Sequence, residues 1–246
     1  TGLSENVIYH YVVTAINSVG ESANSAPAQA RPDPLRAHLK FDESGGSLAS
    51  DSSGDGNHAT TSNAPAWETG KTGNAIRLSG SSSQYASMPK GIGRGLNDHT
   101  VSAWVKMNSL TTWARIFDFG TDTAPGQFTG AYMSLVASDG GGVCFIITNS
   151  GWGNEQIIAG PALTTGVWTH VAVTQSGSVG KLFINGVVVA SNTNMTLNPG
   201  NLGITSRNYL GRSLYGTDPY LNGSLDDFRI HSRALSESEI AGLASP

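Results

Sequence analysis

Residues 166–191 read GVWTHVAVTQSGSVGKLFINGVVVAS, and this stretch decides the fold class. It contains two apolar runs, 168–175 and 180–191, separated by Ser and Gly residues of the kind that form turns. Short apolar runs between turn residues predict antiparallel β-strands joined by short connections. The fold class then depends on how often this pattern recurs.

The pattern recurs from Leu35 to the end of the chain, and no helical pattern is interleaved with it. A series of this kind indicates an all-β, two-sheet antiparallel sandwich of the jelly-roll type. Only Ser236 and Glu239, which have the spacing of a capping box, predict a short helix. Strands are expected at residues 36–41, 74–79, 85–89, 99–107, 114–120, 131–137, 142–148, 155–160, 168–175, 180–191, 208–213 and 224–231.

The composition agrees with this class and excludes several functions. Charged residues make up 13% of the chain, and its 31 glycines suit a turn-rich β protein. The net charge of -4, without a run of Lys or Arg, argues against nucleic acid or a membrane surface as a partner. No apolar run approaches the roughly 20 residues that span a bilayer. Cys144 is the single cysteine, so no internal disulfide can form, and we expect it to be buried in its strand.

The first 30 residues differ from the rest. The chain starts at Thr1 without a Met or an apolar leader, which suggests a piece of a longer protein. The stretches YVVTAINSVGES (11–22) and APAQARP (26–32) resemble the last two strands of a fibronectin type III domain. Leu3 and Tyr9 are placed like that family's tyrosine corner. We therefore expect a C-terminal remnant of such a domain at 1–30 and an extended, proline-containing linker at 31–34.

The last expected strand carries two adjacent carboxylates, Asp226 and Asp227. Because strand side chains alternate between faces, Asp226 is expected to share a face with Phe228 and Ile230 and to be buried. A buried carboxylate needs a cation, a set of hydrogen-bond donors or a raised pKa. Asp227 is expected to pair with Arg229 or to be exposed.

Five blocks of the second part resemble, in order, those of a laminin G-like domain of the concanavalin A-like lectin and glucanase superfamily. The resemblance implies a jelly-roll domain over residues 35–246. The strings ARIFDFG (114–120) and DPYLNG (218–223) are similar to copies of this domain attached to secreted bacterial polysaccharide-degrading enzymes. The five blocks are LKFDESGGSLASDSSGDGNHAT (39–60), GKTGNAIRLSGSSSQYASMP (70–89), HTVSAWVKM (99–107), GVWTHVAVTQSGSVGKLFINGVVVAS (166–191) and LNGSLDDFRIHSRALSESEI (221–240).

The same resemblance implies a structural calcium ion that ties the last strand to the N-terminal segment, with Asp226 at the position of the last-strand ligand. The chain adds Asp42, Asp51, Asp55 and Asn57, which lie among glycines and serines. Calcium takes six to eight oxygen ligands from carboxylates, carbonyls and water. We therefore expect Ca²⁺ at Asp226, Asp42, Asp51 and Asn57. The alternative is a loop of Asx turns without metal.

The sequence lacks the residue patterns of the common hydrolases. Retaining glycosidases need two carboxyl groups about 5 Å apart on one face, and no Glu-x-Asp-x-Glu run occurs here. There is no Gly-x-Ser-x-Gly elbow and no His pair with zinc spacing. His170 is expected to satisfy polar groups near its strand. The sequence therefore predicts that this chain is not an enzyme.

Three polar loops instead combine aromatic rings with hydrogen-bonding side chains, as carbohydrate sites do. Trp152 lies between two glycines and is expected to be exposed, whereas Trp104 and Trp168 are expected to pack in the core. Arg115 and Asp218 either bind sugar hydroxyls or form a structural ion pair. The candidate ligand-binding residues are Trp113, Arg115, Trp152, Asn154, Arg212, Tyr215, Asp218 and Tyr220, with Asn149 and Glu155 in the same loop as Trp152.

These observations favour a non-catalytic carbohydrate-binding module of a secreted, extracellular glycoside hydrolase or polysaccharide lyase. The expected partners are a polysaccharide or oligosaccharide and a catalytic domain in the same parent chain, with the module itself monomeric. A cell-surface adhesion or protein-interaction domain is the alternative, and a degenerate glycoside hydrolase is a more distant one.

Overall fold

The computed structural model describes residues 9–30, 35–124 and 127–245. The chain divides into two units, 1–34 and 35–246. The identification of the first unit as a fibronectin type III remnant stays a prediction, and Leu3 lies outside the described residues. In that unit β1 (Tyr9–Tyr11) pairs with β4 (Ala28–Ala30), and β2 (Ile16–Asn17) pairs with β3 (Gly20–Glu21).

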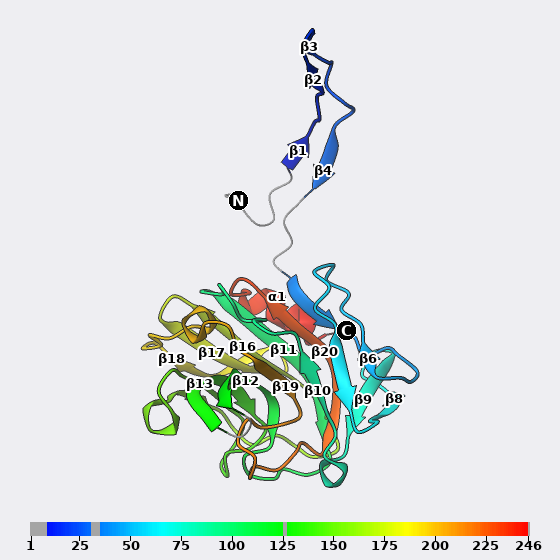
Figure 1. Ribbon diagram of the computed structural model, residues 1–246. Coiled ribbons are helices and arrows are strands. Elements are labelled where there is room, and N and C mark those ends of the chain that lie inside the picture. Colours follow the sequence, from blue (N-terminus) through cyan, green and yellow to red (C-terminus); the bar gives the residue numbers. More distant parts are fainter. Residues whose placement is uncertain (1–8, 31–34, 125–126, 246) are drawn as a thin grey trace. The chain divides into compact units, whose positions relative to one another are not determined.

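Two eight-stranded antiparallel sheets stack face to face in the second unit (Figure 1). They confirm the all-β jelly-roll sandwich. The β12 sheet runs in the order β15 (Gln156–Ala159), β14 (Cys144–Thr148), β13 (Gln127–Val136), β12 (Arg115–Ala124), β19 (Arg207–Leu210), β10 (Tyr85–Met88), β7 (Ala59–Ser62) and β6 (Leu48–Ala49). The β11 sheet runs in the order β18 (Val187–Asn192), β17 (Val179–Ile184), β16 (Trp168–Ser176), β11 (His99–Met107), β20 (Gly223–His231), β9 (Asn74–Leu78) and β8 (Ala66–Thr69), with β5 (Leu35–Leu39) also paired to β20.

Every strand that the sequence predicted is present, and the differences have local causes. The run 180–191 is a hairpin rather than one strand, because Asn185 and Gly186 both have positive φ angles, 48° and 81°. An Asn-Gly pair of this kind forms the tight turn that joins β17 to β18. The sequence analysis missed β6, β7 and β8, which are short and lack a long apolar run.

The hydrophobic core lies between the two sheets and is built by alternation along the strands. Phe117 and Phe119 are two residues apart on β12, so their side chains leave the same face. Both rings pack against Phe228 of β20, with centroid distances of 6.2 and 6.4 Å. All three side chains are fully buried.

A short helix, α1 (Glu237–Leu243), packs on the outer face of the β11 sheet, where Ile240 contacts Ala172 and Phe183. It begins at Ser236 with the predicted capping box, since the Ser236 side chain and Glu239 bond each other's backbone N–H groups. Within the described ranges, no helix has the length and apolar character needed to cross a bilayer. Three 3₁₀ turns complete the unit: η1 (Gly80–Ser82), η2 (Trp152–Asn154) and η3 (Pro199–Leu202).

A β-bulge in β20 changes the position of Asp226. Asp227 has a positive φ of 52°, and the register with β11 shifts beside it. Leu225 and Phe228 therefore both face the core, and Asp226 lies opposite Trp104 on the outer face of the β11 sheet. The prediction that Asp226 shares the apolar face of Phe228 is thus wrong, because a bulge interrupts the two-residue period.

Asp226 is nonetheless buried, at 1% exposure, and its partners are backbone donors. Its Oδ2 accepts hydrogen bonds from the N–H groups of Lys71 (2.8 Å) and Thr72 (3.0 Å). Gly70 opens this turn, and the carboxylate lies over it. The bulge therefore brings the last strand into contact with the turn between β8 and β9.

Because of this contact, we expect that any larger residue at position 70 destabilises the fold. A Cβ atom at Gly70 would lie 2.4 Å from the carbonyl oxygen of Asn74 and 2.6 Å from Oδ2 of Asp226. Overpacking of this kind costs about 1–3 kcal/mol, so Gly70→Ala should lower the melting temperature by several degrees. Gly45→Ala is the matched control, because a Cβ there meets nothing within 4 Å. Equal melting temperatures for the two variants in calorimetry would contradict the packing described.

Candidate functional site

A pocket of about 240 Å³ lies on the outer face of the β12 sheet, the face that points away from the core. Three segments reach it from around the sheet: the turn before β12, the η2 turn, and residues 211–222 between β19 and β20, here called the covering loop. The lining residues, which define the aromatic pocket, are Trp113, Tyr132, Trp152, Glu155, Tyr215 and Asp218.

The covering loop is held to the sheet by a second, smaller apolar cluster. Leu214 packs on Tyr132, Val136 and Cys144, which alternate with core residues along β13 and β14. The loop comes this close because Gly120 has no side chain: a Cβ there would lie 2.5 Å from Leu214. Cys144 is buried as expected, and burial raises the pKa of its thiol to about 12.

Asp118 fastens the same loop through polar contacts. Its Oδ2 accepts hydrogen bonds from the N–H of Leu214 at 3.0 Å and the hydroxyl of Ser213 at 3.4 Å. Burial raises the pKa of Asp118 to about 6, although the positive charge of Arg115, 3.4 Å away, opposes this rise. The loop over the pocket is therefore tied to a fully buried carboxyl group on β12.

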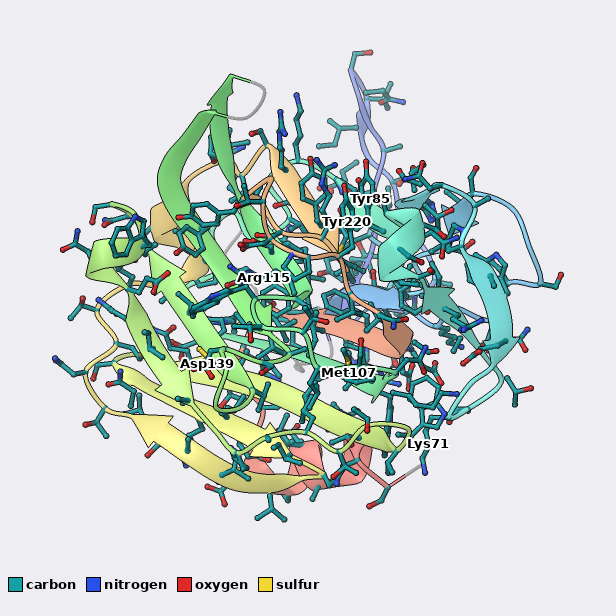
Figure 2. All side chains as sticks on the ribbon, turned by 90° about the horizontal axis from the view of Figure 1, so that it is seen from below. Lys71, Tyr85, Met107, Arg115, Asp139 and Tyr220 are labelled. Carbon is teal, nitrogen blue, oxygen red and sulfur yellow. The ribbon has the colours of Figure 1, made fainter. Side chains whose placement is uncertain are left out.

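Arg115 places two pocket residues at once. Its Nη2 forms an ion pair with Asp218 at 3.1 Å, and its Nη1 donates to the carbonyl oxygen of Trp113 at 2.7 Å. Arg115 is 3% exposed and does not line the pocket. Of the two roles that the sequence left open for it, the geometry supports the structural ion pair rather than direct contact with a sugar. Arg115 is labelled among the strands of this domain in Figure 2.

Trp113 is held in a conformation that bulky residues rarely adopt. Its φ is 70°, yet its ring stays 41% exposed at the rim of the pocket, with the guanidinium carbon of Arg115 5.5 Å from the ring centre. Such backbone strain persists only where the surroundings enforce it, and it concentrates at functional sites. The buried core residue Phe41 also has a positive φ, of 57°, so what sets Trp113 apart is the exposure of its ring at the rim of the pocket.

Tyr132 is the pocket residue that the sequence analysis missed, because it sits in an apolar strand. Its hydroxyl donates a hydrogen bond to the Glu155 carboxylate, and its ring meets Tyr215 edge to face at 6.0 Å. Burial and the contact with Glu155 raise the pKa of Tyr132, which keeps the hydroxyl protonated. At the floor of the pocket the single O–H donor of Tyr132 is therefore used to hold the Glu155 carboxylate.

Trp152 is the most exposed aromatic ring of the pocket, at 76%. Its turn is fixed at Gly151, which has a φ of 92° and donates its N–H to the carbonyl of Gly130 at 2.8 Å. Asn154 belongs to the same turn but does not line the pocket. The structure therefore brings Trp113, Trp152, Tyr215 and Asp218 together, as the sequence analysis grouped them.

Arg212 and Tyr220, the other two candidates, lie outside the aromatic pocket. The guanidinium carbon of Arg212 is 4.6 Å from the ring centre of Tyr209, 4.8 Å from Tyr85 and 5.8 Å from Tyr220. These four residues form the tyrosine–arginine cluster. Figure 2 shows Tyr85 and Tyr220 together, apart from Arg115.

The four residues predicted to hold calcium fall into two groups. Asp42 and Asp226 line one pocket of about 260 Å³ with Thr72. Burial raises the pKa of Asp226 to about 6, and the negative charges of Asp227 and Asp42 add to this rise. Among the described residues, no group of three or more His, Cys, Asp or Glu side chains is placed to hold a metal ion. The calcium site stays a prediction.

Asp51 and Asn57 form a separate, hydrogen-bonded loop. Asp51 accepts from the N–H groups of His38 (2.8 Å), Ser53 (2.9 Å) and Asn57 (2.8 Å). Burial alone would raise the pKa of Asp51, but these hydrogen bonds outweigh it, and the pKa is lowered. The side-chain amide of Asn57 donates to the Arg36 carbonyl at 2.8 Å. This part of the predicted site therefore resembles the Asx-turn alternative.

The remaining residues that the sequence analysis singled out are placed by packing. Trp104 is buried, and its ring meets that of His170 at 5.4 Å. Burial lowers the pKa of His170 to about 4, so this side chain is neutral at physiological pH. Trp168 is only half-buried, with Nζ of Lys106 5.0 Å from its ring centre. Asp227 pairs with Arg229 as expected, at 2.9 Å, and also with His38.

Known proteins share this sequence pattern and fold. The sequence profile of the concanavalin A-like lectin/glucanases superfamily matches residues 79–241. Domain 4 of AbnA, a GH43 extracellular arabinanase from Geobacillus stearothermophilus, was solved in complex with arabinotriose. It is 29% identical to this chain with a TM-score of 0.71, over 86% of this chain and 98% of that one.

Two further proteins resemble this chain, one over a shorter stretch of sequence and one at lower sequence identity. An α-L-arabinofuranosidase from Bifidobacterium longum subsp. longum is 30% identical over 93 residues, which is 36% of this chain and 8% of that enzyme. This chain therefore corresponds to a small part of that enzyme. The CBM40 domain of Ruminococcus gnavus IT-sialidase, bound to α2,3-sialyllactose, shares the fold, with a TM-score of 0.55 and 19% identity over 70% of this chain and 96% of that one.

The environment of Asp118 predicts a pH-dependent stability. Its pKa of about 6 lies above the ordinary 3.8. The folded protein therefore holds this proton more tightly than the unfolded chain, and the resulting stability, present below about pH 4, is lost as the pH rises through about 6. Asp118→Asn cannot titrate. The melting temperature of the wild type minus that of the variant should therefore fall between pH 4 and pH 7.

Other groups that titrate in this range, such as Asp226, are common to both proteins and cancel in the difference. A difference in melting temperature that stays constant or grows with pH would show that Asp118 is ionised at low pH in the folded protein, against the burial described.

Proposed function

This chain belongs to the concanavalin A-like lectin/glucanases superfamily, and we propose that within it the chain acts as a non-catalytic carbohydrate-binding module. The observation that carries the proposal is the aromatic pocket, in which exposed indole rings converge with hydrogen-bonding groups. The likeness of the chain to a domain that was solved with a bound oligosaccharide supports the same proposal.

The pocket has the chemistry that a sugar requires. Trp113 and Trp152 offer flat apolar surfaces that can cover the C–H faces of a sugar ring. Glu155 and Asp218 offer carboxylate oxygens that accept hydrogen bonds from hydroxyl groups. Both carboxylates are already oriented, Glu155 by Tyr132 and Asp218 by Arg115, so little conformational entropy is lost on binding. Two negative charges at the site favour a neutral sugar over an acidic one.

We propose an arabinose-containing polysaccharide as the ligand. The likeness to the arabinotriose-bound domain extends over nearly the whole of that domain, at 29% identity. The shorter match to an arabinofuranosidase supports the same class of glycan. In this proposal the chain is one module of a larger, extracellular glycan-degrading enzyme and holds that enzyme on its substrate.

A role in binding rather than catalysis is supported by the state of the carboxyl groups. Asp118 is buried beneath the covering loop, and Asp218 is engaged by Arg115 and by the Ser213 hydroxyl at 2.9 Å. Glu155, the other carboxylate of the pocket, is held by Tyr132, and this arrangement favours sugar binding over the paired acid and nucleophile of a retaining glycosidase. Sustained release of reducing sugar from arabinan by the pure chain would contradict this part of the proposal.

We further propose that Asp42 and Asp226 bind calcium. Asp42 and Asp226 line one pocket with Thr72, beside Lys40 and Arg229, and the negative charges of Asp227 and Asp42 add to the raised pKa of Asp226. A divalent cation would offset that repulsion, with backbone carbonyls and water supplying the remaining oxygens. Asp51 and Asn57 are not included, because their oxygen and amide groups are used within their own loop.

The sugar site predicts a specific loss on mutation. Trp152→Ala should weaken arabinotriose binding by at least tenfold, since removal of one aromatic anchor costs on the order of 2 kcal/mol. Its melting temperature should stay within a few degrees, because the ring is 76% exposed. Val187→Ala on β18 is the control, since Val187 is 65% exposed and lies on the other sheet. Titration calorimetry measures the affinity of both variants for arabinotriose. Normal binding by Trp152→Ala would rule out stacking on this ring.

The calcium proposal predicts a metal-dependent melting temperature. A ligand at a hundredfold excess over its Kd stabilises the native state by about 2.7 kcal/mol, or roughly 5–10 °C for a domain of this size. Asp226→Asn should remove the response to added calcium, and Asp55→Asn, on an exposed loop position, should keep it. If chelator and calcium leave the wild-type melting temperature unchanged, no calcium site exists here.

A further inference from the structure

The tyrosine–arginine cluster is a second built surface on the same face of the β12 sheet. Tyr85 opens β10 and Tyr209 lies in the neighbouring β19, with their rings edge to face at 5.4 Å. Tyr220, near the end of the covering loop, approaches Tyr85 at 6.0 Å. Arg212 begins the same loop and packs its guanidinium against all three rings.

Arg212 has no acidic partner among the described residues. Arg115, Arg229 and Arg233 each form an ion pair with a carboxylate. No carboxylate in residues 35–124 or 127–245 pairs with Arg212, and its side chain remains partly exposed. The fold thus places a positive charge at the surface without a counter-charge from the described part of the chain.

The tyrosine rings explain how this charge is kept in place. Cation–π contacts of 4.6 to 5.8 Å hold the guanidinium against the rings without consuming its N–H donors. A guanidinium presents a planar fork of donors that matches a carboxylate bidentately, and pre-orientation reduces the entropy lost on binding. The partly exposed rings of Tyr85 and Tyr220 add an apolar surface of the kind that sugars use.

We propose that the tyrosine–arginine cluster is a second glycan subsite, in which Arg212 binds the carboxylate of an acidic sugar such as a uronate. The inference rests on the proposed function, because it extends glycan binding from the aromatic pocket to a neighbouring surface. The two surfaces have opposite charge: Glu155 and Asp218 line the first, and Arg212 is the charged group of the second. Together they fit a polysaccharide that carries both neutral and acidic sugars.

The test compares a uronate with its own neutral ester. Wild-type chain is titrated with trigalacturonate and with its methyl ester, which has the same ring and lacks the charge. The acid should bind at least tenfold more tightly than the ester, and added sodium chloride should reduce this ratio. In Arg212→Gln the ratio should fall to about one, and in Arg212→Lys it should be intermediate. Arg94→Gln, which removes an exposed arginine elsewhere, should leave the ratio unchanged.

The ratio separates recognition from a merely structural role. If Arg212 only fastens the covering loop, Arg212→Gln will lower the affinity for acid and ester by the same factor and will lower the melting temperature, which overturns the proposal. Equal binding of acid and ester by the wild type also overturns it. Arabinotriose is titrated in parallel with the wild type: its failure to bind while the acid preference persists counts against the proposed function and leaves the second subsite standing.

Discussion

The buried guanidinium of Arg115 is the constraint on which the candidate site depends. It sits between Asp118 under the covering loop and Asp218 at the pocket, and it holds the Trp113 carbonyl as well. A buried charge needs compensating partners, and the contacts of Arg115 with Asp118, Asp218 and the Trp113 carbonyl also fix the loop, one carboxylate and one indole ring. The aromatic pocket is thus assembled around a residue that does not itself line it.

The strands of the fold could be predicted from the sequence, because two-residue alternation and turn residues specify strands directly. What alternation cannot reveal is where it breaks. The register shifts beside Ile116 in β12, which puts Arg115 on the same face as Asp118 three residues later. A second bulge at Asp227 moves Asp226 away from the core face. Each bulge is a single extra residue, and no composition signal marks it.

The candidate site could be predicted from the sequence where it lies on loops, but not where it lies on strands. Trp152, flanked by glycines, has little around it to pack on, and it is exposed. Tyr132 reads as one more apolar strand residue, yet the covering loop makes its hydroxyl part of the pocket floor. Arg212 and Tyr220 belong to the right loop but the other cluster. Loop composition indicates a surface, and only the fold divides that surface into two parts of opposite charge.

The most direct test of the central claim is to map arabinotriose binding onto the backbone by NMR. The account predicts that the amide signals that shift on titration belong to the pocket segments, Trp113, 152–155 and 215–218, with smaller changes at Tyr132. Shifts concentrated in β8 and β9, at one edge of the β11 sheet, or the absence of any saturable shift at millimolar ligand, would contradict the assignment of the aromatic pocket as the sugar site.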